Sequence, residues 1–186
     1  IFLLGVAMDR FLKSKEGPAA NIWSMLVNEV YRPIGIAHAP TNRTIEAEDR
    51  PGQPMMAGGL YATLGDLAKI AQLYQARGQH NGMQILHAQK IVELLPGTEK
   101  RGMPTYYMNR FGMTLYFQSF WNVVFDSEEG CRLYVPQMLG WGGNIVSLMP
   151  GGLTGIRLAK DGSQSAEAFD ATGMIKVGDR LVRFCD

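Results

Sequence analysis

The chain has 186 residues, of which 46% are hydrophobic and 19% are charged, and its formal net charge is +1. These values are typical of an ordinary globular chain of one or at most two domains, and they exclude a disordered acidic tail, a collagen-like repeat and a disulfide-dense miniprotein. They also argue against a nucleic-acid-binding function, because the sequence has no basic stripe that could bind phosphates.

The longest apolar run opens the chain and ends before Asp9 and Arg10. A membrane-spanning helix needs about 20 apolar residues, so we expect no span. The run also lacks the basic region and the cleavage site of a signal peptide. Because the sequence begins at Ile1 inside this run, we expect it to be the later part of a longer protein.

The first hundred residues are predicted to be mainly helical. Apolar residues at helical spacing predict helices over 1–13 and 21–31, which Gly17-Pro18 and Pro33 end. Residues 39–56 are polar, contain several Pro and Gly, and have no period. We therefore expect a long surface loop there.

The clearest local signal is the capping box Thr63-Leu64-Gly65-Asp66, which predicts a helix that starts at Thr63. Arg77-Gly78 closes this helix with a cation and with a glycine suited to the C′ position. A loop with Asn81-Gly82 follows, and then a short helix over 87–95.

Aromatic and β-branched residues replace the helical period after residue 97. The predicted strands are one or two over 111–124, one over 132–135, and a β-hairpin of 144–149 and 153–159 joined by Pro150-Gly151-Gly152. A broad apolar face predicts a C-terminal helix over 166–184. Helices thus precede strands and one helix follows them, which favours an α+β fold with an antiparallel β-sheet flanked by helices.

The element types divide near residue 100. Residues 1–100 would form the helical part, and residues 101–186 the sheet strands and the C-terminal helix of the same domain. Cys131 and Cys185 fit two buried thiols as well as one disulfide that ties the end of the chain to a loop.

The sequence predicts no metal site and no cofactor. The three histidines form no H-x-x-x-H pair and have no paired cysteine ligands, and neither a G-x-G-x-x-G motif nor a P-loop is present. These histidines are His38, His80 and His87.

No complete set of catalytic residues is present. The sequence has no G-x-S-x-G elbow, no Ser-x-x-Lys pair and no cysteine-protease signature at Cys131. Its paired carboxylates, within 126–129, are better explained by a solvated turn than by an acid/base pair.

One glycine-rich segment is typical of half of an active site. Three glycines in four positions let a ligand or another backbone approach a strand edge, and a bare edge offers N–H groups to a substrate carbonyl. The alternative is a glycine-rich bulge in which Trp141 is a packing residue. The residues predicted to form this oxyanion or substrate-edge strand are Met138, Gly140, Trp141, Gly142, Gly143 and Asn144.

Three segments resemble the serine β-lactamase-like superfamily, in the branch that includes class C β-lactamases, penicillin-binding proteins, family VIII esterases and nylon-dimer hydrolases. Residues 31–36 resemble its "PLGM"-like turn, and residues 57–67 resemble its "AGGLYST-x-x-DLA" segment. The third match is Gly140-Trp-Gly-Gly-Asn144 with the two apolar runs that follow it.

This resemblance implies a serine hydrolase that acts by acyl transfer on a small-molecule ester, amide or β-lactam. In the family a Ser-x-x-Lys helix and a Tyr-x-Asn/Ser loop precede the segments matched here, so the upstream portion of the same protein would supply the nucleophile and the base. Tyr107-Met108-Asn109 spells the second motif, but it falls too late in the chain and is treated as a chance match. The chain alone would then be inactive.

The third family motif can be matched in two registers. In the first, Met138-Leu139-Gly140 takes the place of Lys-Thr-Gly or His-x-Gly, and a methionine replaces the residue that binds a β-lactam carboxylate. In the second, Trp141-Gly142-Gly143 is the Trp-x-Gly form of the esterases, which favours an ester or amide. Both registers put an oxyanion N–H near 140–143.

The alternative to an enzyme part is a non-catalytic binding or assembly module that uses the β-lactamase-like scaffold. A sheet that lacks its partner strands exposes an edge, which would allow homo-oligomers to form. The resemblance is compatible with both the bacterial periplasm and the cytoplasm.

Overall fold

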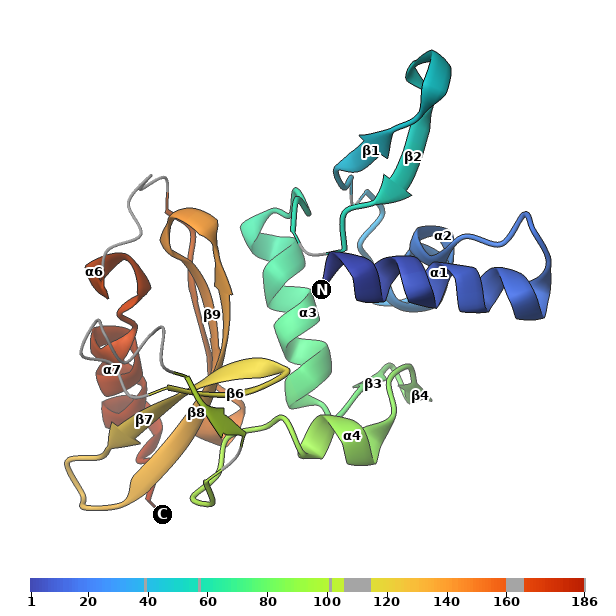
Figure 1. Ribbon diagram of the computed structural model, residues 1–186. Coiled ribbons are helices and arrows are strands. Elements are labelled where there is room, and N and C mark those ends of the chain that lie inside the picture. The colour runs from blue at the N-terminus through green and yellow to red at the C-terminus, as the bar shows by residue number, and fades with distance from the viewer. Residues whose placement is uncertain (39, 57, 101, 106–114, 160–165, 186) are drawn as a thin grey trace. The chain divides into compact units, whose positions relative to one another are not determined.

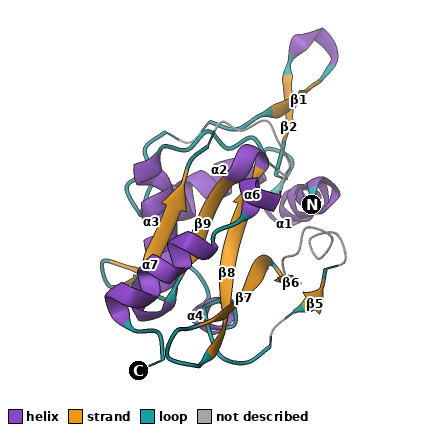
Figure 2. Ribbon diagram, turned by 90° about the vertical axis from the view of Figure 1, so that its left-hand side faces the viewer, coloured by secondary structure: helices purple, strands orange, loops and turns teal. Residues whose placement is uncertain are grey.

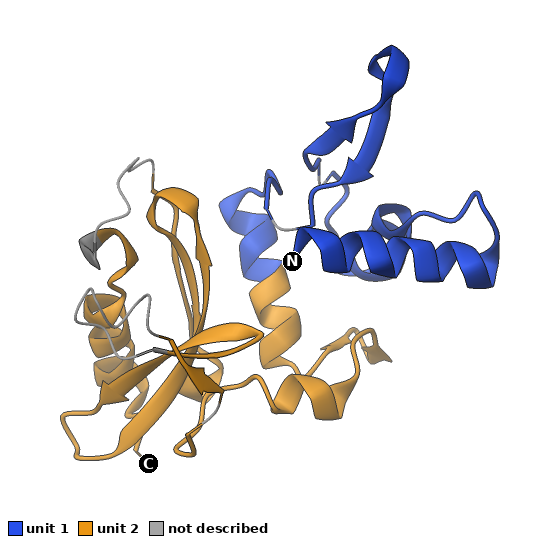
Figure 3. Ribbon diagram, viewed as in Figure 1, with its two compact units in different colours: residues 1–69 blue, residues 70–186 orange. Residues whose placement is uncertain are grey.

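The computed structural model describes residues 1–38, 40–56, 58–100, 102–105, 115–159 and 166–185. The chain divides into two compact units, Ile1–Lys69 (unit 1) and Ile70–Asp186 (unit 2), as Figure 3 shows. The boundary falls within helix α3, Leu64–Gln75. Residues 106–114, which include the Tyr-x-Asn match and the start of the predicted strand region, lie outside the described residues.

Unit 1 begins with the two predicted helices, and both are confirmed. Helix α1 spans Phe2–Glu16 and ends at Gly17. Helix α2, Ile22–Leu26, continues directly into the π-helical turn η1, Val27–Tyr31. Asn21 caps α2, because its side-chain oxygen accepts backbone N–H groups at 3.0 and 3.1 Å.

The prediction of a long surface loop over 39–56 is wrong, because the segment contains two paired strands. Strands β1, Arg43–Ile45, and β2, Pro51–Pro54, form an antiparallel hairpin around the 3₁₀ turn η2, Ala47–Asp49 (Figure 1). The Thr44 hydroxyl accepts the N–H of Gln53 at 2.8 Å across the two strands. Both strands are short and mostly polar, so they lack the apolar alternation by which a strand is detected.

The capping box is confirmed at the start of α3. The Asp66 carboxylate accepts the N–H of Thr63 at 3.0 Å, and the Thr63 hydroxyl accepts the N–H of Asp66 at 3.1 Å. After α3, Asn81 and Gly82 both have positive φ and turn the chain between β3, Gln79–His80, and β4, Met83–Gln84. Asn-Gly suits such a two-residue hairpin turn. The short helix α4 follows at Ala88–Val92.

A six-stranded antiparallel sheet forms the centre of unit 2, so the α+β fold class is confirmed (Figure 2). The strands lie side by side in the order β10-β9-β8-β7-β6-β5, so each strand pairs with its neighbour in sequence. They are β5, Met103–Pro104; β6, Leu115–Gln118; β7, Phe120–Asp126; β8, Arg132–Gly140; β9, Asn144–Leu148; and β10, Thr154–Arg157. The predicted hairpin is β9 and β10, joined by the 3₁₀ turn η4, Pro150–Gly152.

The predicted C-terminal helix is present but interrupted. Helix α6 spans Ala166–Phe169 and helix α7 spans Thr172–Val182. The Asp170 carboxylate accepts the N–H of Thr172 at 2.8 Å, so a side chain between the helices satisfies a free donor at the start of α7. Helix α7 covers one face of the sheet (Figure 2). The buried core between them contains Phe125, Leu133, Val135, Ile145, Met149, Ala171, Ile175 and Phe184.

Cys131 and Cys185 form a disulfide, so of the two predicted alternatives the disulfide is confirmed and the pair of buried thiols is wrong. The disulfide joins the turn between β7 and β8 to the end of the chain. Across the parts of the chain that the structure describes, no helix is both long and apolar enough to cross a membrane.

Candidate functional site

The predicted site segment forms the tight connection between two neighbouring strands. Met138 and Gly140 are in β8, Asn144 opens β9, and the 3₁₀ turn η3, Trp141–Gly143, links the strands. Gly140 lies opposite Asn144 in the strand register. Gly142 and Gly143 have φ of 76° and 83°, a region that side chains with a Cβ rarely adopt. The glycines are therefore required by the turn itself.

Asn144 holds the turn closed from one side. Its amide donates to the carbonyl of Trp141 at 2.6 Å, and its side-chain oxygen accepts the N–H of Ala159 at 3.0 Å. The amide thus fixes both the turn and the chain just after β10. Because both ends of this side chain are engaged with backbone, its role here is to position the turn.

Arg157 in β10 holds the turn from the other side. Its Nε donates to the carbonyl of Gly143 at 3.0 Å, and its two terminal nitrogens donate to the carbonyls of Asp170 and Ala168. One guanidinium therefore joins the turn to α6. A Cβ on Gly143 would lie 2.7 Å from the Ala168 oxygen, so this close approach also requires glycine.

Strand β8 changes its pairing partner near the predicted site. Its first part pairs with β7 up to Gln137, which lies opposite Trp121, and its last part pairs with β9 from Gln137 to Gly140. Over Met138–Gly140 the β7-facing edge of the strand has no strand partner within the described residues. The backbone N–H groups on that edge are donors that a ligand carbonyl could accept.

Trp141 lies at the tip of the turn with 72% of its surface exposed. This exposure does not fit the alternative in which Trp141 is a packing residue. An exposed aromatic ring beside a bare backbone edge provides an apolar surface next to polar groups, an arrangement common in small-molecule sites.

A buried polar pair lies directly behind this edge. Gln137 and Ser147 face each other on β8 and β9, both with 0% exposure, and the Gln137 amide donates to the Ser147 hydroxyl at 3.0 Å. Among the residues that the structure describes, the Gln137 side-chain oxygen has no hydrogen-bond partner. A single glutamine inside an apolar run is the sequence signal that marks this pair.

The site supplies backbone donors but no described nucleophile and base. The two serines that are buried in the described part of the chain, Ser127 and Ser147, form hydrogen bonds with Asp179 and Gln137. The guanidinium of Arg157 is occupied by three carbonyl groups. Arg157 was not predicted as a site residue, and the signal for it is one arginine inside the apolar run 153–159.

The described residues contain no cluster of three or more potential metal-ligating side chains. A scan against protein-family models found no match, and searches of curated proteins and of solved structures found none either.

Proposed function

We propose that this chain is part of a serine hydrolase that acts by acyl transfer on an ester, an amide or a β-lactam. In this proposal the edge at Met138–Gly140 and the turn at Trp141–Gly143 bind the substrate carbonyl, while a Ser-x-x-Lys pair and a base tyrosine come from upstream in the same protein. The observation that carries the proposal is the edge of β8 at Met138–Gly140, which has no strand partner among the described residues and lies beside a glycine turn fixed by hydrogen bonds. One well-placed oxyanion donor is worth about 3 kcal/mol in the transition state.

The rigidity of the turn supports this role. An oxyanion donor must already be in place before charge develops, so that no reorganisation is needed during the reaction. Asn144 and Arg157 together fix the turn through hydrogen bonds to backbone on both sides. Their own polar groups are used in doing so, which leaves the strand edge itself as the binding element.

The test compares the 186-residue chain with a longer protein that includes its upstream sequence. We expect a fluorophosphonate probe to label the longer protein on a serine of a Ser-x-x-Lys pair, and we expect it to hydrolyse nitrocefin or a 4-nitrophenyl ester. The 186-residue chain should do neither. Upstream sequence without that pair, or labelling of a serine within the chain, would sink the proposal.

Two variants of the longer protein test the turn. Trp141→Ala removes the exposed ring beside the edge and should lower kcat/KM for the ester several-fold. Leu181→Ala is the matched control, because Leu181 is an apolar residue of the same unit with 70% exposure. Equal kcat/KM for the two variants would remove Trp141 from the site.

The second candidate function is a non-catalytic binding or assembly module. It is favoured by the burial of Ser127 and Ser147, which are 7% and 0% exposed, so neither hydroxyl is open to a substrate that arrives from solvent. The outer strands β10 and β5 would then be the edges through which copies associate. Sedimentation at several concentrations tests this function, because a strictly monomeric chain would contradict edge association.

A further inference from the structure

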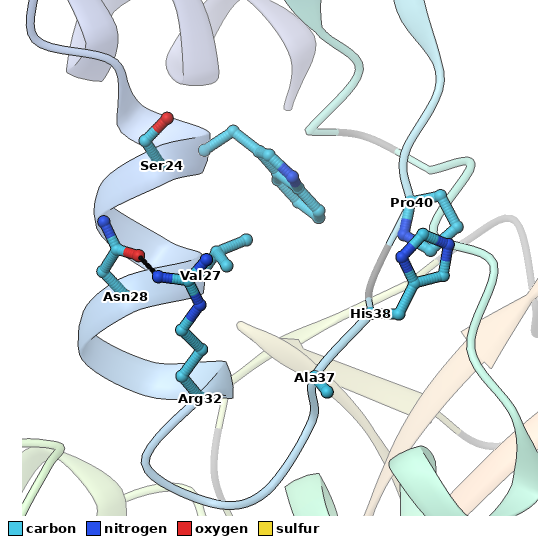
Figure 4. A pocket seen from close by; sticks show the side chains of 8 residues that line it. Ser24, Val27, Asn28, Arg32, Ala37, His38 and Pro40 are labelled. Atoms are coloured by element: carbon cyan, nitrogen blue, oxygen red, sulfur yellow. Dashed lines mark hydrogen bonds between the residues drawn. The ribbon is translucent and has the colours of Figure 1, made fainter.

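A cavity of about 450 Å³ lies in unit 1, between the helix that continues from α2 and the segment that follows it. Ser24, Val27, Asn28 and Arg32 line it from the helix, and His38 and Pro40 face them across the space (Figure 4). Its volume is within the range of small-molecule sites, but most of the residues that line it are exposed, so it is an open hollow on the surface of the unit. It shares no residue with the β8–β9 turn.

The positive charge of Arg32 favours an anionic ligand in the cavity. Arg32 carries the one fixed charge among the described residues that line it, and no carboxylate is among them. Within the described part of the chain, no acidic side chain forms a salt bridge with Arg32. A guanidinium without a carboxylate partner matches a singly charged carboxylate, which it can bind through two parallel hydrogen bonds.

Asn28 orients this guanidinium. Its side-chain oxygen accepts one terminal N–H of Arg32 at 2.7 Å, as the dashed line in Figure 4 shows. The remaining N–H groups of the fork are not engaged by any hydrogen bond found among the described residues. Asn28 is therefore a positioning residue for Arg32.

An aromatic ring provides the other half of the cavity. Trp23 lines it and is half-buried, and its ring packs edge-on against Tyr31 with centroids 5.8 Å apart and planes 72° apart. Tyr31 is buried, so the indole is held in place from behind. Val27 and Pro40 add apolar surface. A flat apolar ligand can pack against such a wall.

The backbone beneath the cavity is unusual. The N–H of Arg32 donates to the carbonyl of Val27 at 2.9 Å, five residues back, which is the hydrogen bond of a π-helix. Such turns are rare, and they occur frequently at functional sites. Val27, Asn28 and Arg32 all lie on this turn or cap it.

We infer that this cavity is a binding site for a small aromatic carboxylate, whose carboxylate pairs with Arg32 and whose ring packs beside Trp23. The inference does not rest on the proposed hydrolase function, and either can fail without the other.

The test is a titration of the ¹⁵N-labelled 186-residue chain with benzoate, followed by NMR. The chain has three tryptophans, so three indole N–H signals are expected, and Trp23→Phe identifies the one at the cavity. Benzoate should shift the Trp23 signal saturably and leave the other two unchanged. The neutral isostere benzamide should bind at least tenfold more weakly.

Three variants test whether the charge of Arg32, rather than a loss of folding, changes the affinity for benzoate. Arg32→Gln should weaken benzoate binding at least tenfold, and Asn28→Ala should weaken it less, because it removes only the positioning bond. Arg50→Gln is the matched control, since Arg50 is an exposed arginine of the same unit, and it should bind benzoate as the parent chain does. A ¹⁵N spectrum of each variant in which only signals near the substituted residue differ from those of the parent chain shows that the variant is folded.

Three results would overturn the inference. The first is equal binding of benzoate and benzamide, which would show that charge is not recognised. The second is displacement of benzoate by an equal concentration of inorganic phosphate, which would indicate a general anion site without a role for the ring. The third is benzoate binding by Asn28→Ala and Arg32→Gln that equals binding by the Arg50→Gln control.

Discussion

Among the described residues each unit buries one aspartate, and the two units stabilise it by different interactions. In unit 1, Asp9 is 2% exposed, pairs with the ammonium of Lys13 at 2.7 Å and accepts the N–H of Ile22 at 2.9 Å. In unit 2, Asp179 is 6% exposed and accepts neutral donors, the hydroxyl of Ser127 at 2.6 Å and the N–H of Phe184 at 3.0 Å. One carboxylate is neutralised by a partner charge, and the other is solvated by dipoles.

In unit 2 the turn after β7 is joined to the last residues of the chain by two kinds of link, hydrogen bonds and a disulfide. Asp179 ties the turn after β7, through Ser127, to the end of the chain at Phe184, and the disulfide ties Cys131 of that turn to Cys185. In unit 1, Asp9 joins α1 to the start of α2 by the hydrogen bond to Ile22, with no covalent link beside it. Unit 2 should therefore resist local opening at this junction better than unit 1 does.

Removal of the covalent link should give the largest effect. The disulfide closes a loop of 54 residues, for which the chain-entropy account gives about 4 kcal/mol. We expect the double variant Cys131→Ser, Cys185→Ser to lose about this much of its free energy of unfolding, measured by urea denaturation. Hydrogen exchange should then quicken in β7 and β8 and stay unchanged in α1.

A reducing agent provides the control for this prediction. It should lower the unfolding midpoint of the parent chain and leave the double variant unaffected. If the two chains have equal free energies of unfolding, unit 2 does not depend on its covalent link, and the contrast with unit 1 disappears.

Removal of the buried acceptor in unit 2 should have the next largest effect. Asp179→Ala leaves the donors of Ser127 and Phe184 buried without a partner, which should cost about 3 kcal/mol of unfolding free energy. Asp179→Asn keeps one acceptor oxygen and should cost less. The exposed Glu129 of the same turn is the matched control, and Glu129→Ala should leave the denaturation curve in place. A loss in Glu129→Ala as large as in Asp179→Ala would point to the turn rather than to the carboxylate.

Acid should weaken both units through these carboxylates. Burial by itself raises the pKa of Asp9, but the hydrogen bonds from Lys13 and Ile22 together outweigh it, so its pKa lies below the ordinary value. The pKa of Asp179 is lowered in the same way, by Ser127 and Phe184 against the effect of burial. In the unfolded chain both titrate near pH 4.

The sign of the pH dependence follows from these directions. Because each pKa is lower in the folded chain, the contribution of each carboxylate is complete above about pH 4 and is lost as the pH falls through the folded value. We expect the free energy of unfolding to fall between pH 5 and pH 2.5 by less in Asp9→Asn than in the parent chain. Equal losses in the two chains would show that Asp9 takes up its proton equally in both states.

Local patterns were enough to predict the helices and the five strands β6 to β10, whereas the strands β1 to β5 were not predicted. The capping box at Thr63 and the hairpin around Pro150–Gly152 lie within a few residues, so short-range chemistry determines them. The β1–β2 hairpin was missed because its pairing, such as that of Thr44 with Gln53, has no apolar alternation to mark it.

The sequence was enough to predict the turn of the candidate site, but not the hydrogen bonds that hold the turn in place. The glycines of the site indicate a tight connection. The support from Arg157 is not local, because its guanidinium donates to Gly143, 14 residues earlier in the chain, and to Ala168 of α6, 11 residues later. The bond between Ser127 and Asp179 spans 52 residues. Contacts of this kind depend on how strands and helices pack, and no local spacing encodes them.

Salt should produce the smallest effect, and it separates the two units most cleanly. The side chain of Lys13 is 40% exposed, so its pair with Asp9 is open to screening, and the Debye length falls to about 3 Å at 1 M salt. Lys13→Gln should cost about 1 kcal/mol at low salt and about half of that in 1 M NaCl. Asp179→Asn should cost the same at both salt concentrations, because its donors are a hydroxyl and a backbone N–H. Mobile ions do not reach the buried dipoles that bind Asp179, so its hydrogen bonds should not be screened. A salt dependence in Asp179→Asn as large as that in Lys13→Gln would therefore mean that Asp179, like Asp9, is stabilised by a charged partner.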